Sequence, residues 1–242
     1  MGPANLAVHR EYLARFVRSG DVVLDAGAGP GRFTIELVQL GAEVVVADVS
    51  AAQLELNREK VALAGCEHAV RERVVADVTD LGRFDDGSFD AVVCYGGPLS
   101  YAVDRADDAV AELVRVTKPG GHVLVSVMSL VGALTHYVDI AVELAARDGA
   151  DTMREIVRTG YLPMGDDYGH LPMKLFRWRE LHELLSRHGD VVAGAAAGLL
   201  RPTEPPEAPE LRELLTEVEL DLGAEAAAID GGEHLLAVLR KP

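Results

Sequence analysis

The chain is poor in cysteine, and it has no long apolar run. Its 242 residues include only two cysteines, Cys66 and Cys94, which make neither a metal-type pair nor a disulfide framework and so fit a reducing compartment. No apolar stretch approaches the roughly 20 residues that a membrane-spanning helix needs. The N-terminus lacks a charged-then-apolar leader, so the cytoplasm is the expected compartment.

Positive charge is also scarce. The chain has 23 lysines and arginines against 39 aspartates and glutamates, which gives a formal net charge of −16. Proteins that bind nucleic acid or anionic membranes need clustered cations to meet the phosphates. The composition therefore argues against both partners and favours a small-molecule substrate, with the protein acting as a monomer or a homodimer.

Strand-like runs alternate with amphipathic stretches through the first half of the chain. This alternation predicts right-handed βαβ crossovers and a doubly wound, Rossmann-like α/β fold, with a mostly parallel sheet and helices on both faces. Strands are expected at 22–26, 44–48, 72–76, 89–94 and 121–128, and helices at about 32–40, 51–64 and 104–117.

The alternation loosens after Met128. Residues 129–176 combine a helical stretch at about 131–147 with a loop at 160–170, and a long segment of this kind is usually functional. We therefore expect one domain over residues 1–242, with 129–176 as an insertion that covers the substrate. The remaining elements expected are a helix at 177–188, a strand at 190–200, a helix at 210–222 and a final strand at about 233–240.

A glycine-rich turn follows the first apolar run. Its glycines give G-x-G-x-G, which lets bare backbone approach a ligand at the carboxyl edge of the sheet. Arg32 stands where a dinucleotide fingerprint needs its third glycine, and no Gly-Lys-Ser/Thr ending marks a phosphate loop. Asp48 closes the second apolar run about 20 positions further on, where an acid can bind a ribose. The pattern indicates a nucleoside-bearing cofactor.

The run D-A-G-A-G-P-G-R at 25–32, preceded by Val22-Val23-Leu24, closely resembles the first motif of class I S-adenosylmethionine-dependent methyltransferases of the small-molecule type. The resemblance continues in order along most of the chain. Further stretches that resemble the family lie at 44–50, 76–78, 89–94, 113–121 and 176–181, and 235–242 resembles its antiparallel last strand.

This resemblance implies methyl transfer from S-adenosylmethionine to an O or N atom of a small-molecule acceptor, with specialised metabolism as one setting. It places Asp25 near the cationic end of the cofactor, Asp48 at the ribose, and Asp77 with Val78 at the adenine. The full set of cofactor-binding residues that it implies is Asp25, Ala26, Gly27, Gly29, Arg32, Asp48, Val49, Gln53, Asp77, Val78 and Tyr95.

The acceptor is expected beside residues 95–101, which follow the fourth strand and lack the Asn-Pro-Pro-type motif of some amino-methylating relatives. Substrate contacts are assigned to Ser100, Tyr101 and Tyr168. An alcohol or phenol acceptor needs a base, and His170 and His136 are the candidates because imidazole titrates near neutrality. The alternative for either histidine is a surface role. No acid spacing predicts a metal site.

Two other functions remain open. One is a protein that binds S-adenosylmethionine without transferring its methyl group, as a cyclase-like or regulatory protein, because function resides in the acceptor site rather than in the fold. The other is a nucleotide-dependent oxidoreductase, against which the missing third glycine argues.

Overall fold

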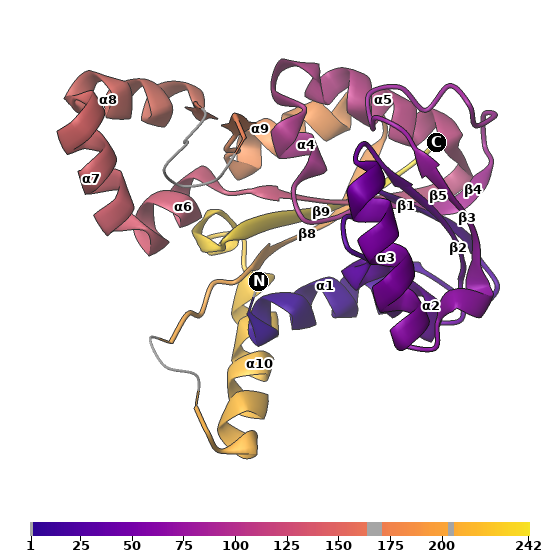
Figure 1. The fold of residues 1–242 in the computed structure, drawn as a ribbon. Helices are drawn as coiled ribbons and strands as arrows, with labels where there is room; N and C mark the ends of the chain where they lie inside the picture. Colours follow the sequence, from indigo (N-terminus) through magenta and orange to yellow (C-terminus); the bar gives the residue numbers. More distant parts are fainter. Residues whose placement is uncertain (1, 164–170, 203–205) are drawn as a thin grey trace.

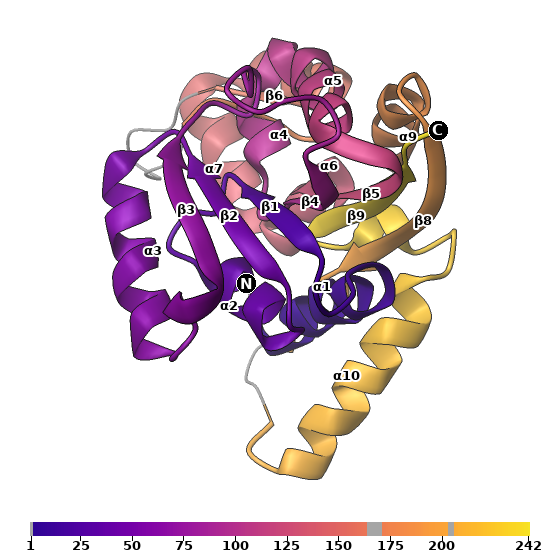
Figure 2. The ribbon, with the colours of Figure 1, turned by 90° about the vertical axis from the view of Figure 1, so that its right-hand side faces the viewer.

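The computed structural model describes residues 2–163, 171–202 and 206–242, and a seven-stranded sheet runs through its centre (Figures 1 and 2). The strand order is β3-β2-β1-β4-β5-β9-β8. The first five strands pair in parallel, whereas β9 is antiparallel to both β5 and β8. Their bounds are β1 (Val22–Ala26), β2 (Glu43–Asp48), β3 (Val70–Val75), β4 (Phe89–Cys94), β5 (Thr117–Met128), β8 (Asp190–Ala197) and β9 (His234–Arg240). The predicted fold class and the antiparallel last strand are confirmed.

Helices cover both faces of the sheet because successive strand residues point to opposite sides. In β1, Val23 packs with α1 (Pro3–Phe16), α2 (Arg32–Gln39) and α3 (Ala51–Leu63). Its neighbour Leu24 packs on the other side, in the cluster that includes α5 (Ala106–Val116) and α9 (Trp178–Ser186). Both side chains are fully buried. A further helix, α10 (Pro209–Gly223), runs beside α1 and β8 (Figure 2).

Some element boundaries differ from the expectation. The helix expected at 104–117 is α5, preceded by the 3-10 turn η2 (Val103–Arg105), and the short helix α4 (Pro98–Tyr101) before them was not expected. The fifth strand begins at Thr117 rather than 121, because the turn at Gly120, with φ of 74°, forms an irregularity within the strand rather than preceding it.

The segment after Met128 is more helical than expected. It forms α6 (Leu130–His136), α7 (Val138–Asp148) and α8 (Ala150–Thr159), which extend as an arm from the sheet (Figure 1). The expected loop is partly wrong, because β6 (Tyr161–Leu162) pairs with β7 (Met173–Lys174). A small apolar cluster holds the arm together, formed by Leu130, Leu144, Ile156, Met173 and Leu175.

Two 3-10 turns outside these elements belong to the described part of the chain. The 3-10 turn η1 (Glu67–Ala69) leads into β3, and η4 (Ile229–Gly231) precedes β9. Among the residues that the structure describes, no helix combines the length and the apolarity needed to cross a membrane.

Candidate cofactor site

The glycine turn lies at the carboxyl edge of the sheet, between the end of β2 and α4. Gly27, Gly29 and Gly31 all have positive φ values, of 72°, 52° and 91°, a conformation that side chains disfavour. The N–H of Gly27 donates to Ala47 O at 2.8 Å, and a Cβ on Gly27 would overlap the ring of Pro98. Glycine is therefore required there, and it brings the turn against the start of α4.

Asp48, at the end of β2, is held in one orientation by backbone donors. Its Oδ2 accepts from the N–H of Gly29 at 2.8 Å, and its Oδ1 accepts from the N–H of Ser50 at 2.8 Å. An ionised carboxylate has about four lone-pair sites, so each oxygen can accept a further hydrogen bond. The carboxylate is only 7% exposed and lies directly beside the glycine turn. This geometry fits a ligand with two adjacent hydroxyls.

Asp25 is buried beneath the turn. The Oγ1 of Thr34 donates to its Oδ2 at 2.6 Å, and Asn57 Nδ2 donates in turn to Thr34 Oγ1 at 2.9 Å. Burial, with a smaller contribution from the charge of Asp48, raises the pKa of Asp25 to about 7, against the opposing hydrogen bond from Thr34. Near neutral pH the side chain is therefore divided between its charged and neutral forms, and a neighbouring cation would favour the charged form.

Gln53 lies in the first turn of α3, where its N–H donates to Ser50 Oγ at 3.4 Å, so that Ser50 caps the helix. Its Oε1 is buried and has no hydrogen-bond partner in the part of the chain that the structure describes. That oxygen is 4.0 Å from where a Cβ on Gly29 would be. A buried acceptor without a donor is costly, so the residues present fit a ligand that brings a donor to this point.

The adenine end of the predicted site is formed after β3. Asp77 is exposed, and its Oδ1 accepts from the N–H and the hydroxyl of Thr79 at 2.9 and 2.8 Å. Val78 is half-buried and packs against the core. Val49, which directly follows β2, is 69% exposed and offers an apolar surface to a ligand.

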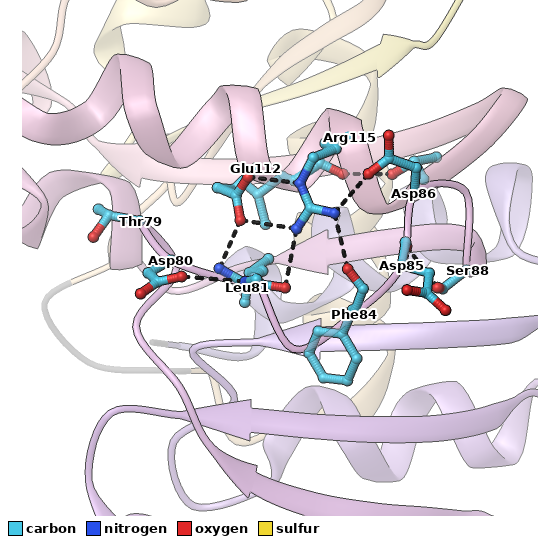
Figure 3. Close-up of polar contacts among 12 residues, drawn as sticks. Thr79, Asp80, Leu81, Phe84, Asp85, Asp86, Ser88, Glu112 and Arg115 are labelled. Carbon is cyan, nitrogen blue, oxygen red and sulfur yellow. Dashed lines mark hydrogen bonds and ion pairs between the residues drawn. The ribbon is translucent and has the colours of Figure 1, made fainter.

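An arginine fixes the loop that follows Asp77 (Figure 3). The guanidinium of Arg115, on α5, donates to the carbonyls of Leu81 and Phe84 at 3.0 and 2.8 Å. It also pairs with Asp86 and Glu112, at 2.8 and 2.7 Å. Glu112 completes the network by accepting from the N–H of Leu81 at 2.7 Å. The loop is therefore attached to α5 through both its carbonyls and its amides.

The other predicted cofactor residues lie nearby. Ala26 is fully buried at the end of β1, and Arg32 is exposed at the start of α2. Tyr95 is buried, and its ring packs edge-on against Phe33 and His9 at centroid distances of 5.1 and 4.8 Å. The ring of Tyr95 thus lies within the core, below the turn.

The predicted acceptor residues are less clearly grouped. Ser100 is fully buried, and its Oγ accepts from the N–H of Met128 at 3.0 Å, a bond that joins α4 to β5. Tyr101 is 42% exposed on α4. His136 ends α6, and its Nε2 lies 2.9 Å from Gly231 O, next to β9. Tyr168 and His170 lie outside the described residues.

His9 is a residue that the sequence did not single out. It is fully buried on α1, with its ring 5.2 Å from that of Phe33 and 5.7 Å from that of His234. Its Nδ1 contacts Asn5 O at 2.9 Å, whereas Nε2 has no partner among the described residues. Burial, followed by the charge of His234, lowers the pKa of His9 to about 3. The available signal was its spacing, one helical turn after Asn5 and before Leu13.

Among the described ranges, no group of three or more histidines, cysteines or acids lies together in a way that would hold a metal ion.

Residues 23–121 match the family described as a methyltransferase domain, Methyltransf_25. Two curated relatives are similar to part of the chain. Demethylmenaquinone methyltransferase from Clavibacter sepedonicus is 42% identical over 107 residues, which cover 44% of this chain and 41% of that protein. The ubiquinone/menaquinone biosynthesis C-methyltransferase UbiE from Pseudomonas paraeruginosa is 38% identical over 112 residues, 45% of this chain and 42% of that protein. The similarity thus spans less than half of each relative.

Solved structures are similar along nearly the whole chain, at identities that establish the fold alone. A putative S-adenosylmethionine-dependent methyltransferase from Listeria monocytogenes has a TM-score of 0.65 at 16% identity and covers 100% of both chains. The 1,6-didemethyltoxoflavin-N1-methyltransferase of Burkholderia thailandensis, solved with S-adenosylhomocysteine, has a TM-score of 0.56 at 19% identity and covers 99% of this chain and 76% of its own. The [4+2]-cyclase SpnF has a TM-score of 0.60 at 16% identity and covers 98% and 80%.

The matched family spans the glycine turn, Asp48, Asp77 and the strands that carry them. Taken with the strand order, this match supports a methyltransferase domain over residues 23–121, which is less than half of the chain, with S-adenosylmethionine as the cofactor.

Proposed function

We propose that this protein transfers a methyl group from S-adenosylmethionine to an O or N atom of a small-molecule acceptor. The observation that carries the proposal is the carboxylate of Asp48, fixed by the N–H groups of Gly29 and Ser50 at the carboxyl edge of the sheet. There it can accept both ribose hydroxyls. The assignment of residues 129–176 as the acceptor cover belongs to the same proposal.

Each part of the site has a physical role in this reaction. The glycine turn lets backbone N–H groups approach the carboxylate of the methionine end. Asp25 supplies a negative charge near its cationic groups, and Asp77 accepts from the adenine amino group while Val78 packs on the ring. The cofactor contributes a sulfonium-bound methyl group. These contacts position that methyl group, and positioning contributes much of the acceleration in a displacement of this kind.

The chemistry is an in-line displacement. A lone pair of the acceptor O or N forms the new bond to the methyl carbon as the carbon–sulfur bond breaks, and the sulfonium becomes a neutral thioether. The acceptor then loses its proton to a base or to water. His136 and His170 remain candidates for that base, and single-turnover rates of their alanine variants across pH test them, because loss of a base changes the profile.

Methylation at a carbon atom is the alternative to methylation at O or N. Of the curated relatives described above, one is named a demethylmenaquinone methyltransferase and the other a ubiquinone/menaquinone biosynthesis C-methyltransferase. The family match ends at residue 121, before the segment 129–176. Because the proposed acceptor cover lies beyond that match, a quinone precursor methylated at carbon is the alternative outcome rather than the proposal.

A second candidate function is binding of S-adenosylmethionine without methyl transfer. The likeness to the cyclase SpnF supports it, since that protein shares the fold and is named for a different reaction.

Calorimetric titration with S-adenosylmethionine and S-adenosylhomocysteine tests the cofactor site, and we expect both to bind. If neither compound binds and NAD binds tightly instead, the result would favour an oxidoreductase. Mass spectrometry after incubation with cofactor carrying an isotopically labelled methyl group and a panel of phenols, amines and quinols tests transfer. A labelled product identifies the acceptor class, and binding without any product favours the second candidate.

A further inference from the structure

A cavity of about 250 Å³ lies between the start of α1, the segment that follows β8, and α10. It is at the same edge of the sheet as the cofactor site. Ala197 ends β8 opposite His234, and His234 begins β9 opposite Met128, the last residue of β5. In open α/β sheets, ligands bind outside the carboxyl ends of the strands. The cavity therefore has the position of a ligand site, displaced toward β8 and β9.

The wall formed by α10 is held in place by a buried acid. Glu219 is fully buried, and its carboxylate accepts three hydrogen bonds from consecutive backbone N–H groups, those of Gly198, Leu199 and Leu200, at 2.6, 2.8 and 2.7 Å. Hydrogen bonds to a carboxylate are about twice as strong as neutral ones. They join α10 to the segment after β8, so two sides of the cavity are fixed to each other.

The floor of the cavity has an acceptor that lacks a donor. Asn5 is only 2% exposed, and its Nδ2 donates to Glu233 Oε2 at 2.8 Å and lies 3.1 Å from His234 Nδ1. These contacts fix which end of the amide is oxygen. Oδ1 has no hydrogen-bond partner within the described parts of the chain. A ligand with a hydroxyl group would supply the missing donor.

Two cations border the same space. Arg201 and Arg212 both line the cavity, as does Glu233, whose carboxylate interacts electrostatically with Arg201. The guanidinium of Arg201 lies 4.7 Å from the ring centroid of Tyr137, and the hydroxyl of Tyr137 donates to Glu233 Oε1 at 3.1 Å. Arg212 forms no ion pair in the described part of the chain, although the whole chain has a net charge of −16, and guanidinium groups match carboxylates. Leucine and proline side chains form the apolar walls.

A short chain of side chains connects this cavity to the cofactor site. Asn5 contacts His234, the ring of His234 lies 5.7 Å from that of His9, and the ring of His9 lies 4.8 Å from that of Tyr95. Tyr95 directly follows β4, beside the expected position of the transferable methyl group. A ligand in the cavity is thus separated from that position by two aromatic layers.

We propose that this cavity binds a small hydroxylated ring compound that carries a carboxylate. Its hydroxyl donates to Asn5 Oδ1, its carboxylate pairs with Arg212, and its ring packs against Leu200 and Leu215. The volume matches one or two rings and is smaller than the usual pocket for a drug-sized ligand. Because two aromatic layers separate the cavity from the expected position of the transferable methyl group, this compound is a second ligand and not the methyl acceptor.

A fluorescent hydroxynaphthoate is the probe, titrated into the full chain with and without S-adenosylhomocysteine. Two analogues test the polar contacts: methoxynaphthoate lacks the hydroxyl donor and naphthol lacks the carboxylate. We expect each analogue to bind at least tenfold more weakly than the probe. The variant Arg212→Gln, on the surface of α10, should weaken the probe several-fold and leave naphthol unchanged. Leu215→Trp, which fills the cavity, should abolish binding of all three.

Arg179→Gln is the matched control, because Arg179 is 80% exposed on α9 and should have no effect. The proposal is overturned if the hydroxynaphthoate does not bind, or if its binding is unaffected by both Arg212→Gln and Leu215→Trp. Calorimetry with S-adenosylhomocysteine on the same samples keeps the two proposals separate. If the unmodified protein does not bind S-adenosylhomocysteine, the proposed function is contradicted. If it binds S-adenosylhomocysteine but not the probe, only the proposed ligand site in the cavity is contradicted.

Discussion

Single residues carry most of the proposed cofactor recognition, and Asp48 carries the largest share. Substituting Asn for Asp48 leaves one acceptor oxygen and turns an amide NH₂ toward a backbone N–H of Gly29 or Ser50. We expect the Kd for S-adenosylhomocysteine to rise about 10- to 100-fold, since each 1.4 kcal/mol corresponds to tenfold and an unsatisfied buried group costs about 1–3 kcal/mol.

Calorimetry measures the effect, and chemical unfolding of the same variant checks that the fold survives. Asp151→Asn is the control, because the side chain of Asp151 is 96% exposed. A Kd for Asp48→Asn within error of the unmodified protein would contradict the ribose assignment.

The raised pKa of Asp25 predicts a pH-dependent stability. The carboxyl of an unfolded chain ionises near its ordinary pKa of 3.8, whereas burial keeps Asp25 protonated in the folded chain until about pH 7. Between these values the folded state binds more protons, so this residue lowers the free energy of unfolding as pH rises, by up to about 1.4 kcal/mol per pH unit. Above pH 7 the effect is constant.

Asp25→Asn removes this titration and can still accept the hydrogen bond from Thr34. We expect the free energy of unfolding of the variant, relative to the unmodified protein, to increase from pH 4 to pH 7 and then level off. Urea unfolding at a series of pH values measures the difference, which cancels the contribution of all other groups. Parallel curves for the two proteins would show that Asp25 ionises normally when folded.

Among single residues, the sequence predicted the glycine turn and Asp48 better than the rest of the site. These residues could be predicted because they belong to a local sequence motif. The burial of Tyr95 and Ser100 is not, because it depends on α1 and β5, which pack against them from distant parts of the chain. His9 was missed for the same reason.

Among the elements, the loop that follows β3 depends most on one side chain. Arg115→Lys removes the planar fork that reaches the carbonyls of Leu81 and Phe84 together with Glu112. We expect the free energy of unfolding to fall by about 1–3 kcal/mol, in the range for lost hydrogen bonds to buried partners. The Kd for S-adenosylhomocysteine should rise several-fold, since Asp77 loses its fixed position.

Arg154→Lys is the matched control, since Arg154 is 75% exposed and forms one ion pair on α8. Urea unfolding measures the stability of each variant, and calorimetry measures its Kd for S-adenosylhomocysteine. A loss of stability without any change in Kd would mean that the loop does not position the adenine contact.

The arm is the element that the sequence predicted least well. The helix at 150–159 has apolar residues at Met153, Ile156 and Val157, a helical spacing, but only Ile156 is fully buried. So few apolar residues among many charged ones do not give a recognisable amphipathic pattern in the sequence. The central strands β1, β2 and β4 were predicted closely because their apolar runs are buried on both faces, which leaves a continuous signal.

For the molecule as a whole, Glu219 determines how α10 joins the sheet. In Glu219→Gln the side chain keeps one acceptor oxygen for three backbone donors. We expect the free energy of unfolding to fall by about 1–3 kcal/mol and binding of the hydroxynaphthoate to weaken, with cofactor binding unchanged. Glu217→Gln, an exposed acid on the same helix, is the control. Equal stabilities for the two variants would contradict this role.

The overall fold class was predictable because the βαβ alternation is encoded locally. The position of β9 between β5 and β8 was not predictable. The strands β5 and β8 are far apart in the sequence, and no local sequence pattern shows that β9 pairs with both.

That placement also orders the assembly of the protein during synthesis. The strands β1 to β5 are all complete by Met128, so the cofactor half can pair as it leaves the ribosome. Within the described residues, β8 pairs with β9 alone and must therefore wait for residues 234–240 to be made. The cavity beside β8 is consequently the last region to form, and a ribosome-bound chain that ends before β9 would bind cofactor before it bound any second ligand.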